Sequence, residues 1–449
     1  MGVDRKLVKF PSLLLAALPM ISCATASAPP PADVAESLRT RTGANVRLGG
    51  AESPAIPAGV QVDDGLSRDE AVAIALWNNA AFQVSASQLG FARADLADAG
   101  IISNPVLSLL FPWGPKQLEW TLRWPAEVLW ERPKRVAAAK LSADASAQSL
   151  VQSGLDLVLA VRLAYADLAL AIDRQRLAEE AATTLQRIDT LTQSRLAAGD
   201  IAELDARAAR VDAVRSALDF ERAVHDVTIA RERLRLLLGL GADDRSLERL
   251  QASADPERCG EPPDLMKRAL AARPDLRAAE LTVEAAGARL GWERSRILTL
   301  TAVLDANGEG KEGFEMGPGI DVSIPLFNRN QGGRLRGEAE LQRASAVYVS
   351  LQRQVGLDVR EASTLFDQAR GSRVAWGERI VTPLRTNLAD AEKSYSAGES
   401  SYLFVLENSR RLIEARLRER ELAADEQRAQ ARIERASGTA CRPATGVMR

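Results

Sequence analysis

The sequence has few of the residues on which most enzymes and metal sites depend. Its 449 residues include one histidine, His225, and three cysteines. A zinc site needs three or four closely spaced His, Cys or carboxylate ligands, and the sequence has no such cluster. No Ser or Cys nucleophile has an evident histidine partner. Gly308-Glu309-Gly310 does not follow a strand and open a helix, as a phosphate-binding loop does. We therefore expect no enzyme activity, no cofactor and no bound metal.

Neither sign of charge is in excess. Lys and Arg number 58 and Asp and Glu number 60, which leaves a formal net charge of −2. Nucleic-acid-binding proteins carry a basic excess, so this balance argues against nucleic acid as a partner. Aromatic residues make up 4% of the chain and hydrophobic residues 46%. The apolar content is thus mostly Ala, Leu and Val, which suits closely packed helices.

The sequence also lacks an apolar run long enough to span a bilayer as a helix. The N-terminal candidate, Phe10 to Ile21, is too short. It follows a basic segment, as in a secretory signal peptide, and we assign residues 1–22 to such a peptide. The basic residues are Arg5, Lys6 and Lys9.

The end of this segment, Met20-Ile21-Ser22-Cys23, resembles a bacterial lipobox. The resemblance implies export, cleavage before Cys23 and lipidation of that cysteine, and Ala24 after it is compatible with a place in the outer membrane. Ordinary cleavage after Ala28 is the alternative, with Pro29 following the cut. Residues 23–64 are rich in Pro and Ala, and we predict a lipid-anchored extended tether there.

Glycine and proline are nearly absent from a long central stretch. From 134 to 197 there is no proline and one glycine, Gly154. Apolar residues in this stretch recur at spacings of three and four, which is the seam of a coiled coil. Gly199 offers a left-handed helix C-cap, and Asp200 offers an N-cap to the next helix. We predict a helical hairpin over 132–238, about 100 Å long, whose seam needs partners. The seam residues are Val158, Val161, Tyr165, Leu168 and Ile172.

The same pattern occurs a second time about 200 residues later. The turn at Gly199-Asp200 matches Gly398-Glu399 at an offset of 199, and Trp124-Pro125 matches Ile324-Pro325 at an offset of 200. Such a period indicates duplication of a whole unit. We assign a first repeat to 65–240, a linker to 241–261, a second repeat to 262–438 and a tail to 439–449. The second helical hairpin is predicted over 331–437.

Each repeat opens with a predicted helix followed by a β-hairpin. Ser67 and Glu70 form a capping box that starts a helix running to Ile101. Hairpins are predicted over 104–125 and, around a Gly-rich loop at 307–313, over 298–327. The strongest strand signal is an apolar and aromatic face with a period of two. It consists of Leu118, Trp120, Leu122 and Trp124.

This alternation suits the lipid-facing side of a transmembrane β-barrel, and Trp suits a membrane interface. Four strands cannot close a barrel, and open backbone edges are excluded from lipid. The chain must therefore oligomerise if it spans a membrane, and three copies would supply twelve strands. The alternative is two small soluble hairpins at the end of a helical bundle.

Taken together, these features resemble TolC-type outer membrane factors, whose lipidated branch serves tripartite efflux systems. The resemblance rests on the lipobox, the two repeats and the segment Ser323-Ile324-Pro325-Leu326-Phe327-Asn328-Arg329-Asn330. It implies a mainly α fold with a membrane β-barrel portion. In a homotrimer, a twelve-stranded barrel would lie in the outer membrane of a Gram-negative bacterium, below which a long α-helical barrel crosses the periplasm. The implied partners are outer membrane lipid, a periplasmic adaptor and an inner-membrane pump of the resistance-nodulation-division type.

The resemblance also implies roles for the two helical turns. The turns would form the periplasmic tip, where an adaptor docks, with Arg195, Gly199, Asp200, Gly398 and Glu399. Acidic residues one to two turns further would form a constriction of the lumen, and here they are Asp205 and Glu407. The position equivalent to Asp205 in the second repeat is Phe404, which departs from the acidic pattern.

Two cysteines, Cys259 and Cys441, lie in loops just beyond the two helical hairpins. An oxidising compartment permits a disulfide between them, and two free thiols are the alternative. From all these features we predict the outer membrane channel of a tripartite efflux system. The alternative is a lipid-anchored periplasmic coiled-coil scaffold that never spans the membrane.

Overall fold

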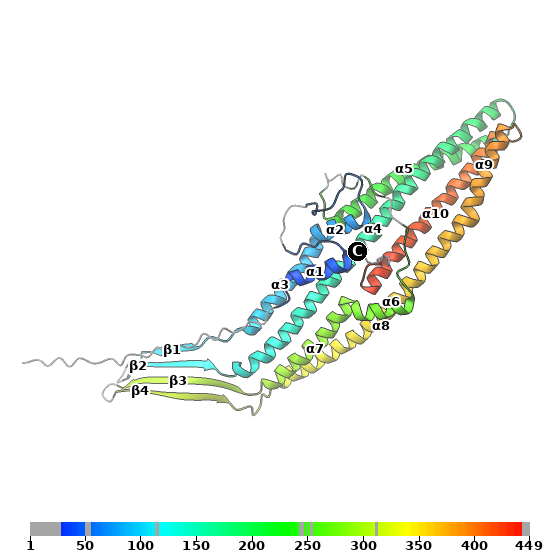
Figure 1. The fold of residues 1–449 in the computed structure, drawn as a ribbon. Coiled ribbons are helices and arrows are strands. Elements are labelled where there is room, and N and C mark those ends of the chain that lie inside the picture. The colour runs from blue at the N-terminus through cyan, green and yellow to red at the C-terminus, as the bar shows by residue number, and fades with distance from the viewer. Residues whose placement is uncertain are drawn as a thin grey trace, which may run out of the picture.

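Long helices dominate the computed structural model, and a four-stranded sheet extends from one end of them (Figure 1). The structure describes residues 28–49, 55–111, 113, 116–241, 247, 249–251, 255–309 and 313–441. The predicted signal peptide and Cys23 lie outside these residues, as does most of the tail. None of the helices in the described ranges is long and apolar enough to cross a membrane.

The first helical hairpin is formed by α4 (Val128–Ala197) and α5 (Glu203–Leu238). The hairpin predicted from the sequence is confirmed, but α4 begins four residues before the predicted start and contains Pro133. The chain turns into α4 directly from the sheet, because the N–H groups of Ala126 and Glu127 both donate to Leu300 O, at 2.7 and 3.2 Å. Proline near a helix start removes a single intrahelical hydrogen bond.

The second helical hairpin has the predicted outer bounds but contains an interruption. It consists of α8 (Gln331–Trp376), a π-helical turn η1 (Gly377–Val381), α9 (Thr382–Ser396) and α10 (Tyr402–Ser437). Pro383 lacks an N–H, so the helix loses one backbone hydrogen bond next to this wider turn. Trp376 Nε1 donates to Ala415 O at 2.9 Å and fixes the turn against α10.

The predicted single helix from Ser67 to Ile101 is wrong. The structure has α2 (Arg68–Asn78) and α3 (Ala80–Gly100), although the capping box at its start is confirmed. The break is at Asn79, whose side chain accepts from Phe82 N at 2.9 Å and donates to Leu237 O at 2.8 Å. The end of α5 therefore holds Asn79 in an extended conformation.

The second repeat breaks at the corresponding place. Its opening helices are α6 (Pro262–Ala272) and α7 (Pro274–Ser295), with Arg273 between them. Proline disfavours a helical conformation in the residue before it, so Pro274 explains this break.

The predicted extended tether over 23–64 is wrong for α1 (Pro31–Thr42). Leu38 of α1 is fully buried and lies against α4 at Gly154, where an added Cβ would come within 2.6 Å of Leu38 Cδ2. Arg41 Nη1 donates to backbone oxygens at the ends of α6 and α10, at 2.7 and 2.8 Å. This helix thus joins the two repeats.

The two hairpins form one antiparallel sheet in the order β1-β2-β3-β4. The strands are β1 (Val106–Leu110), β2 (Lys116–Pro125), β3 (Thr299–Glu309) and β4 (Gly313–Ser323). The predicted loop at 307–313 is too long, since strand pairing extends from Asn307 to Glu309 and resumes at Gly313. The return strand ends at Ser323, so Ile324 and Leu326 lie beyond it.

Candidate functional site

The two helical turns lie at the end of the molecule opposite the sheet (Figure 1). Gly199 and Gly398 have φ angles of +82° and +78°, which glycine adopts most readily. The N–H groups of Asp200 and Glu399, one residue later, donate to carbonyls five residues earlier, at 2.9 and 2.8 Å. Both turns are therefore Schellman motifs. A Cβ added at either glycine would meet no atom of the described residues within 4 Å.

Asp200 is not the N-cap that the sequence predicted. The N-cap of α5 is Ala202, which provides no side-chain cap, whereas Ser401 caps α10 by accepting from Phe404 N. The N–H of Asp200 closes the preceding helix, so the chain needs two more residues before the next helix begins. The two turns share the same backbone conformation, but only the helix after the second turn, α10, has a side-chain N-cap.

The two carboxylates predicted at the constriction have different surroundings. Asp205 is exposed in the first turn of α5. Glu407 accepts from Arg410 at 2.8 and 3.1 Å, and Arg411 lies 3.5 Å away. The hydrogen bond from Arg410 holds the pKa of Glu407 below its ordinary value. Within the described residues these two carboxylates share no hydrogen bond or ion pair. Phe404, three residues before Glu407 on α10, is 54% exposed.

A groove that the sequence did not predict runs between α4, α5 and α10, with a volume of about 960 Å³. Acidic and basic residues alternate along its α5 side at spacings of three and four. This charge pattern is the sequence signal from which the groove could have been predicted. Arg410 and Glu414 of α10 face it and pair with each other at 2.7 Å. The α5 residues are Asp212, Arg215, Asp219 and Arg222.

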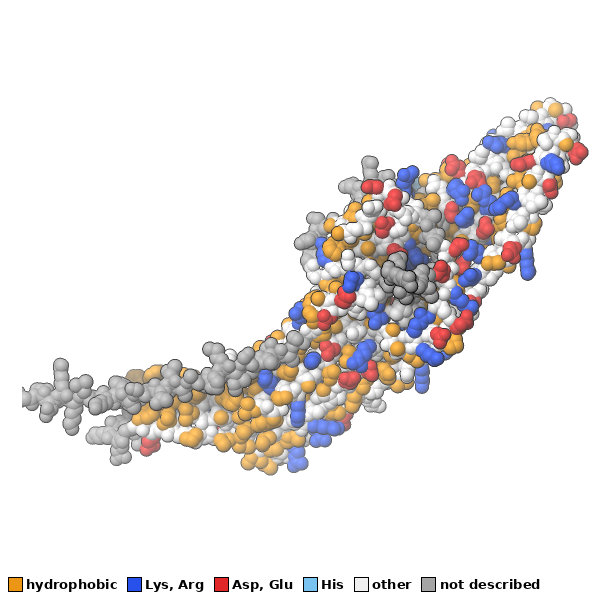
Figure 2. Space-filling model, in the orientation of Figure 1, with side chains coloured by type: hydrophobic (Ala, Val, Ile, Leu, Met, Phe, Trp, Pro, Cys, Tyr) orange, Lys and Arg blue, Asp and Glu red, His pale blue; other side chains and the backbone are white. Residues whose placement is uncertain are grey.

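The strand register gives the sheet one apolar and one polar face. Leu122 pairs with Leu107 on one side and Leu304 on the other, and directly paired residues share a face. Leu118, Trp120 and Trp124 are on the same face as Leu122, by the alternation of a strand. Figure 2 shows apolar side chains over this region.

The opposite face of the sheet carries polar pairs. Thr121 Oγ1 donates to Asp305 at 2.7 Å, and Arg123 lies 3.8 Å from Asp321. The sheet therefore has the two-sided character that the alternation predicted.

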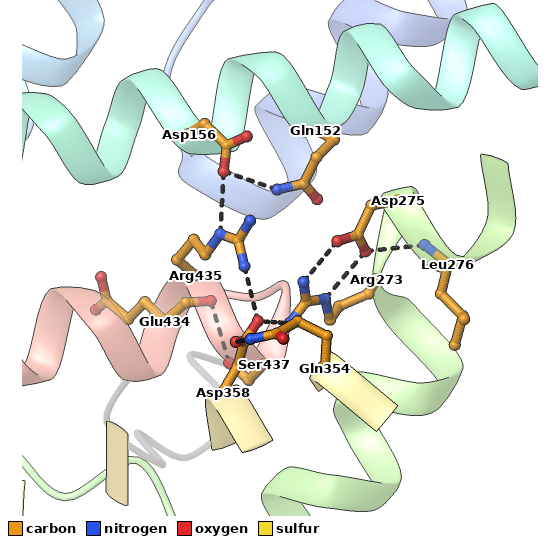
Figure 3. Close-up of polar contacts among 10 residues, drawn as sticks. All are labelled: Gln152, Asp156, Arg273, Asp275, Leu276, Gln354, Asp358, Glu434, Arg435 and Ser437. Carbon is orange, nitrogen blue, oxygen red and sulfur yellow. Dashed lines mark hydrogen bonds and ion pairs between the residues drawn. The ribbon is translucent and has the colours of Figure 1, made fainter. Parts of the chain in front are cut away.

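Midway along the molecule, an ionic network joins four helices of both repeats (Figure 3). Arg273, 1% exposed, contacts Asp275 of α7 at 2.5 Å and Asp358 of α8 at 2.7 Å. Arg435 of α10 contacts Asp358 and also Asp156 of α4, both at 3.0 Å. The available sequence signal for this network was Pro274, because the helix break before it leaves Arg273 between α6 and α7, where the side chain is buried.

Burial opposes ionisation of Asp358, but hydrogen bonds from Arg273 and Gln354 outweigh it and lower the pKa of its carboxyl. Because the pKa of Asp358 is lowered in the fold, its ionised carboxylate contributes its full stabilisation above the ordinary aspartate pKa of about 3.9. This contribution is lost as the pH falls through the lower pKa of the folded state. We expect Asp358→Asn to be less stable at neutral pH and to lose less stability on acidification. Unfolding followed by circular dichroism at several pH values checks this. The control is Asp167→Asn, which removes an exposed carboxylate that pairs with Arg428 and should lose stability on acidification as steeply as the wild type does. A loss as steep as the wild type's in Asp358→Asn would contradict the prediction.

A second ion pair between the repeats is almost completely buried. Arg162 of α4 contacts Glu434 of α10, and each side chain is 7% exposed. Burial lowers the pKa of Arg162 to about 10. The Glu434 carboxylate also accepts from Cys441 N at 3.3 Å.

Cys259 and Cys441 are joined by a disulfide, with their Cα atoms 5.0 Å apart. This separation is usual for a disulfide. The bond ties the end of the linker to the segment after α10, and it decides between the two alternatives that the sequence left open. No group of three or more potential metal ligands occurs among the described His, Cys, Asp and Glu residues.

Comparison with known proteins identifies the family. The family model for outer membrane efflux proteins matches residues 120–240 and 265–439, which include both repeats from β2 and α6 onward. The chain belongs to the outer membrane efflux protein family. The resemblance found in the sequence is thus confirmed, and so is the predicted function as an outer membrane efflux channel rather than a scaffold.

Two curated relatives and one solved structure illustrate the similarity. The cobalt-zinc-cadmium resistance protein CzcC of Cupriavidus metallidurans is 25% identical over 358 residues, covering 79% of this chain and 85% of CzcC. The probable outer membrane lipoprotein SilC of Salmonella typhimurium is 26% identical and covers 57% of this chain and 58% of SilC. A membrane protein of Pseudomonas aeruginosa has the same fold, with a TM-score of 0.68, 20% identity and coverage of 88% and 100%.

Proposed function

We propose that three copies of this outer membrane efflux protein form a duct that exports metal cations. We infer the trimer from the four-stranded sheet, which is apolar on one face and polar on the other. Among the described residues of one chain, no strand pairs with the outer edges of β1 and β4, and lipid cannot satisfy the backbone groups on those edges. Twelve strands from three copies would close a barrel with the apolar face toward lipid.

The names of two relatives support metal cations as the substrate and a lipid anchor at Cys23. CzcC, whose name specifies cobalt, zinc and cadmium, aligns over most of both chains. SilC is named as a probable outer membrane lipoprotein, in agreement with lipidation of Cys23 in the outer membrane of a Gram-negative bacterium. The lipid-facing residues would be Leu118, Trp120, Leu122 and Trp124.

The helical turns are the proposed docking site for a periplasmic adaptor. Arg195, Gly199, Asp200, Gly398 and Glu399 lie at the end farthest from the sheet. The charged groove between α4, α5 and α10 offers a second contact further along the helices from these turns, because its alternating Asp and Arg side chains could pair with an adaptor helix. The adaptor would connect the duct to an inner-membrane pump, which we take to be of the resistance-nodulation-division type.

Replacing Gly199 or Gly398 with leucine is expected to abolish metal resistance while the protein remains folded. A residue with a side chain is strained at positive φ by about 1 to 2 kcal/mol, and a leucine there adds bulk where an adaptor would dock. The measurement is growth of a strain lacking the gene, complemented with each variant, on zinc, cobalt and cadmium salts. Gly59→Leu is the matched control, because Gly59 has a φ of +92° and open space around it but lies far from the turns. Normal resistance in both turn variants at normal expression would contradict adaptor docking at the turns, and metal tolerance unchanged by gene loss would contradict the substrate.

At the proposed constriction, Asp205→Asn is expected to reduce the cation selectivity of the reconstituted channel more than Glu407→Gln does. Rings of carboxylates favour cations in a pore, but the charge of Glu407 is already compensated by Arg410. Reversal potentials in a KCl gradient across planar bilayers check this. A larger effect from Glu407→Gln would mean that Asp205 does not line the narrowest part.

A further inference from the structure

Where the chain leaves β4, exposed apolar side chains are followed at once by exposed basic ones. The sequence contains no Asp or Glu from residue 322 to residue 337. We call this set the exit collar. Its apolar members are Ile324, Leu326, Phe327 and Leu335, which are 66% to 92% exposed. Its basic members are Arg329, Arg334 and Arg336, all exposed.

The first repeat shows the same order where β2 leads into α4. Leu129 is 65% exposed, and Lys134 follows it on the surface. The acidic residues between β2 and Lys134 turn toward other parts of the chain: Glu127 accepts from Leu300 N at 3.2 Å, and Glu131 accepts from Trp292 Nε1 at 3.4 Å. In Figure 2, the apolar surface of the sheet gives way to Lys and Arg side chains where the helices begin.

Among the described residues, the basic groups of the collar have no acidic partner. Arg329 Nε donates to Pro325 O at 3.3 Å, a neutral partner. Arg334 and Arg336 form no ion pair within the described residues, whereas Arg294 on neighbouring α7 lies 3.3 Å from Glu338. Within the part of the chain that the structure describes, the collar thus presents unpaired positive charge at the edge of an apolar surface.

We propose that the exit collar binds the phosphate groups of anionic phospholipids in the periplasmic leaflet of the outer membrane. The inference rests on the proposed barrel, because the collar continues its lipid-facing side. The order along the molecule is apolar strand, exposed aromatic residue, then Arg, which matches hydrocarbon core, interface and phosphate layer. A second copy of the chain is the competing occupant, because neighbours in a cyclic trimer meet through unlike surfaces. The collar would thereby fix the depth of the barrel in the membrane.

The test uses the full-length protein purified from the outer membrane in a nonionic detergent. Phosphatidylglycerol and phosphatidylcholine are titrated separately, and bound lipid is counted by native mass spectrometry while the melting temperature is followed. The variant Arg329→Gln/Arg334→Gln/Arg336→Gln is compared with Arg343→Gln/Arg353→Gln/Arg360→Gln. The control removes the same charge from exposed sites further along α8.

We expect the wild type and the control to bind phosphatidylglycerol at lower concentration than phosphatidylcholine. The collar variant should need at least about tenfold more phosphatidylglycerol, given roughly fivefold for each basic group near an anionic surface. Equal affinities in the two triple variants, or equal binding of both lipids by the wild type, would overturn the proposal. So would dissociation of the collar variant's oligomer without added lipid, which would make the collar a contact between copies. Absence of a wild-type oligomer and of channel currents would instead count against the duct itself.

Discussion

Replacing Glu434 with alanine is expected to lower the free energy of unfolding by about 3 to 5 kcal/mol. The substitution leaves the Arg162 guanidinium in a site where its side chain is 7% exposed, without the carboxylate that contacts it. Asp69, 3.4 Å from Arg162, compensates little because its own side chain is 75% exposed. Denaturant unfolding of the detergent-solubilised protein, followed by circular dichroism, measures the loss.

Two controls separate the buried charge from the loss of the pair itself. Asp167→Ala removes a 51% exposed carboxylate that pairs with Arg428, leaves Arg428 its second partner Asp425, and should cost no more than about 1 kcal/mol. The double variant Arg162→Met/Glu434→Leu removes both charges and should recover most of the stability, because an apolar pair of similar volume avoids the desolvation penalty. A double variant as unstable as Glu434→Ala would show that the hydrogen bond to Cys441 N or local packing, not charge burial, sets the cost.

Replacing Leu122 with arginine is expected to abolish insertion into the outer membrane. Leu122 lies in the middle of the apolar face, between Leu107 and Leu304. An arginine on the lipid side of a barrel costs about 2 to 4 kcal/mol near the bilayer midplane, and a trimer bears it three times. Cell fractionation and the presence of a heat-modifiable oligomer on gels provide the measurement.

The matched control for this prediction is the neighbouring residue. Thr121→Arg adds the same charge to the opposite face, beside Asp305, which already accepts from Thr121 Oγ1 at 2.7 Å. We expect this variant to insert and to assemble normally. Normal insertion of Leu122→Arg would mean that the apolar face does not contact lipid, and failure of both variants would indicate a general intolerance of β2 to substitution.

Patterns that repeat within a few residues were predictable from the sequence. The long helical hairpins follow from helix-forming residues with a three-four seam, the turns from Gly199 and Gly398, and β2 from strict alternation. The duplication added confirmation, because each repeat shows the same order of elements. The predictions failed where the local signal was outweighed by a distant contact. Asn79 breaks a helix whose flanking residues favour continuation, since its side chain bonds to the end of α5.

The sequence by itself therefore determined the family, the two repeats, the helical hairpins and the two-faced strands, because each depends on the spacing of neighbouring residues. The tertiary structure decided which residues meet across long separations. It joined Cys259 to Cys441, 182 residues apart, placed Arg273 against Asp358, and packed Leu38 of a segment expected to be extended against Gly154. Such contacts have no local period, since they depend on where two separately formed elements come together and on which charges burial then forces to pair.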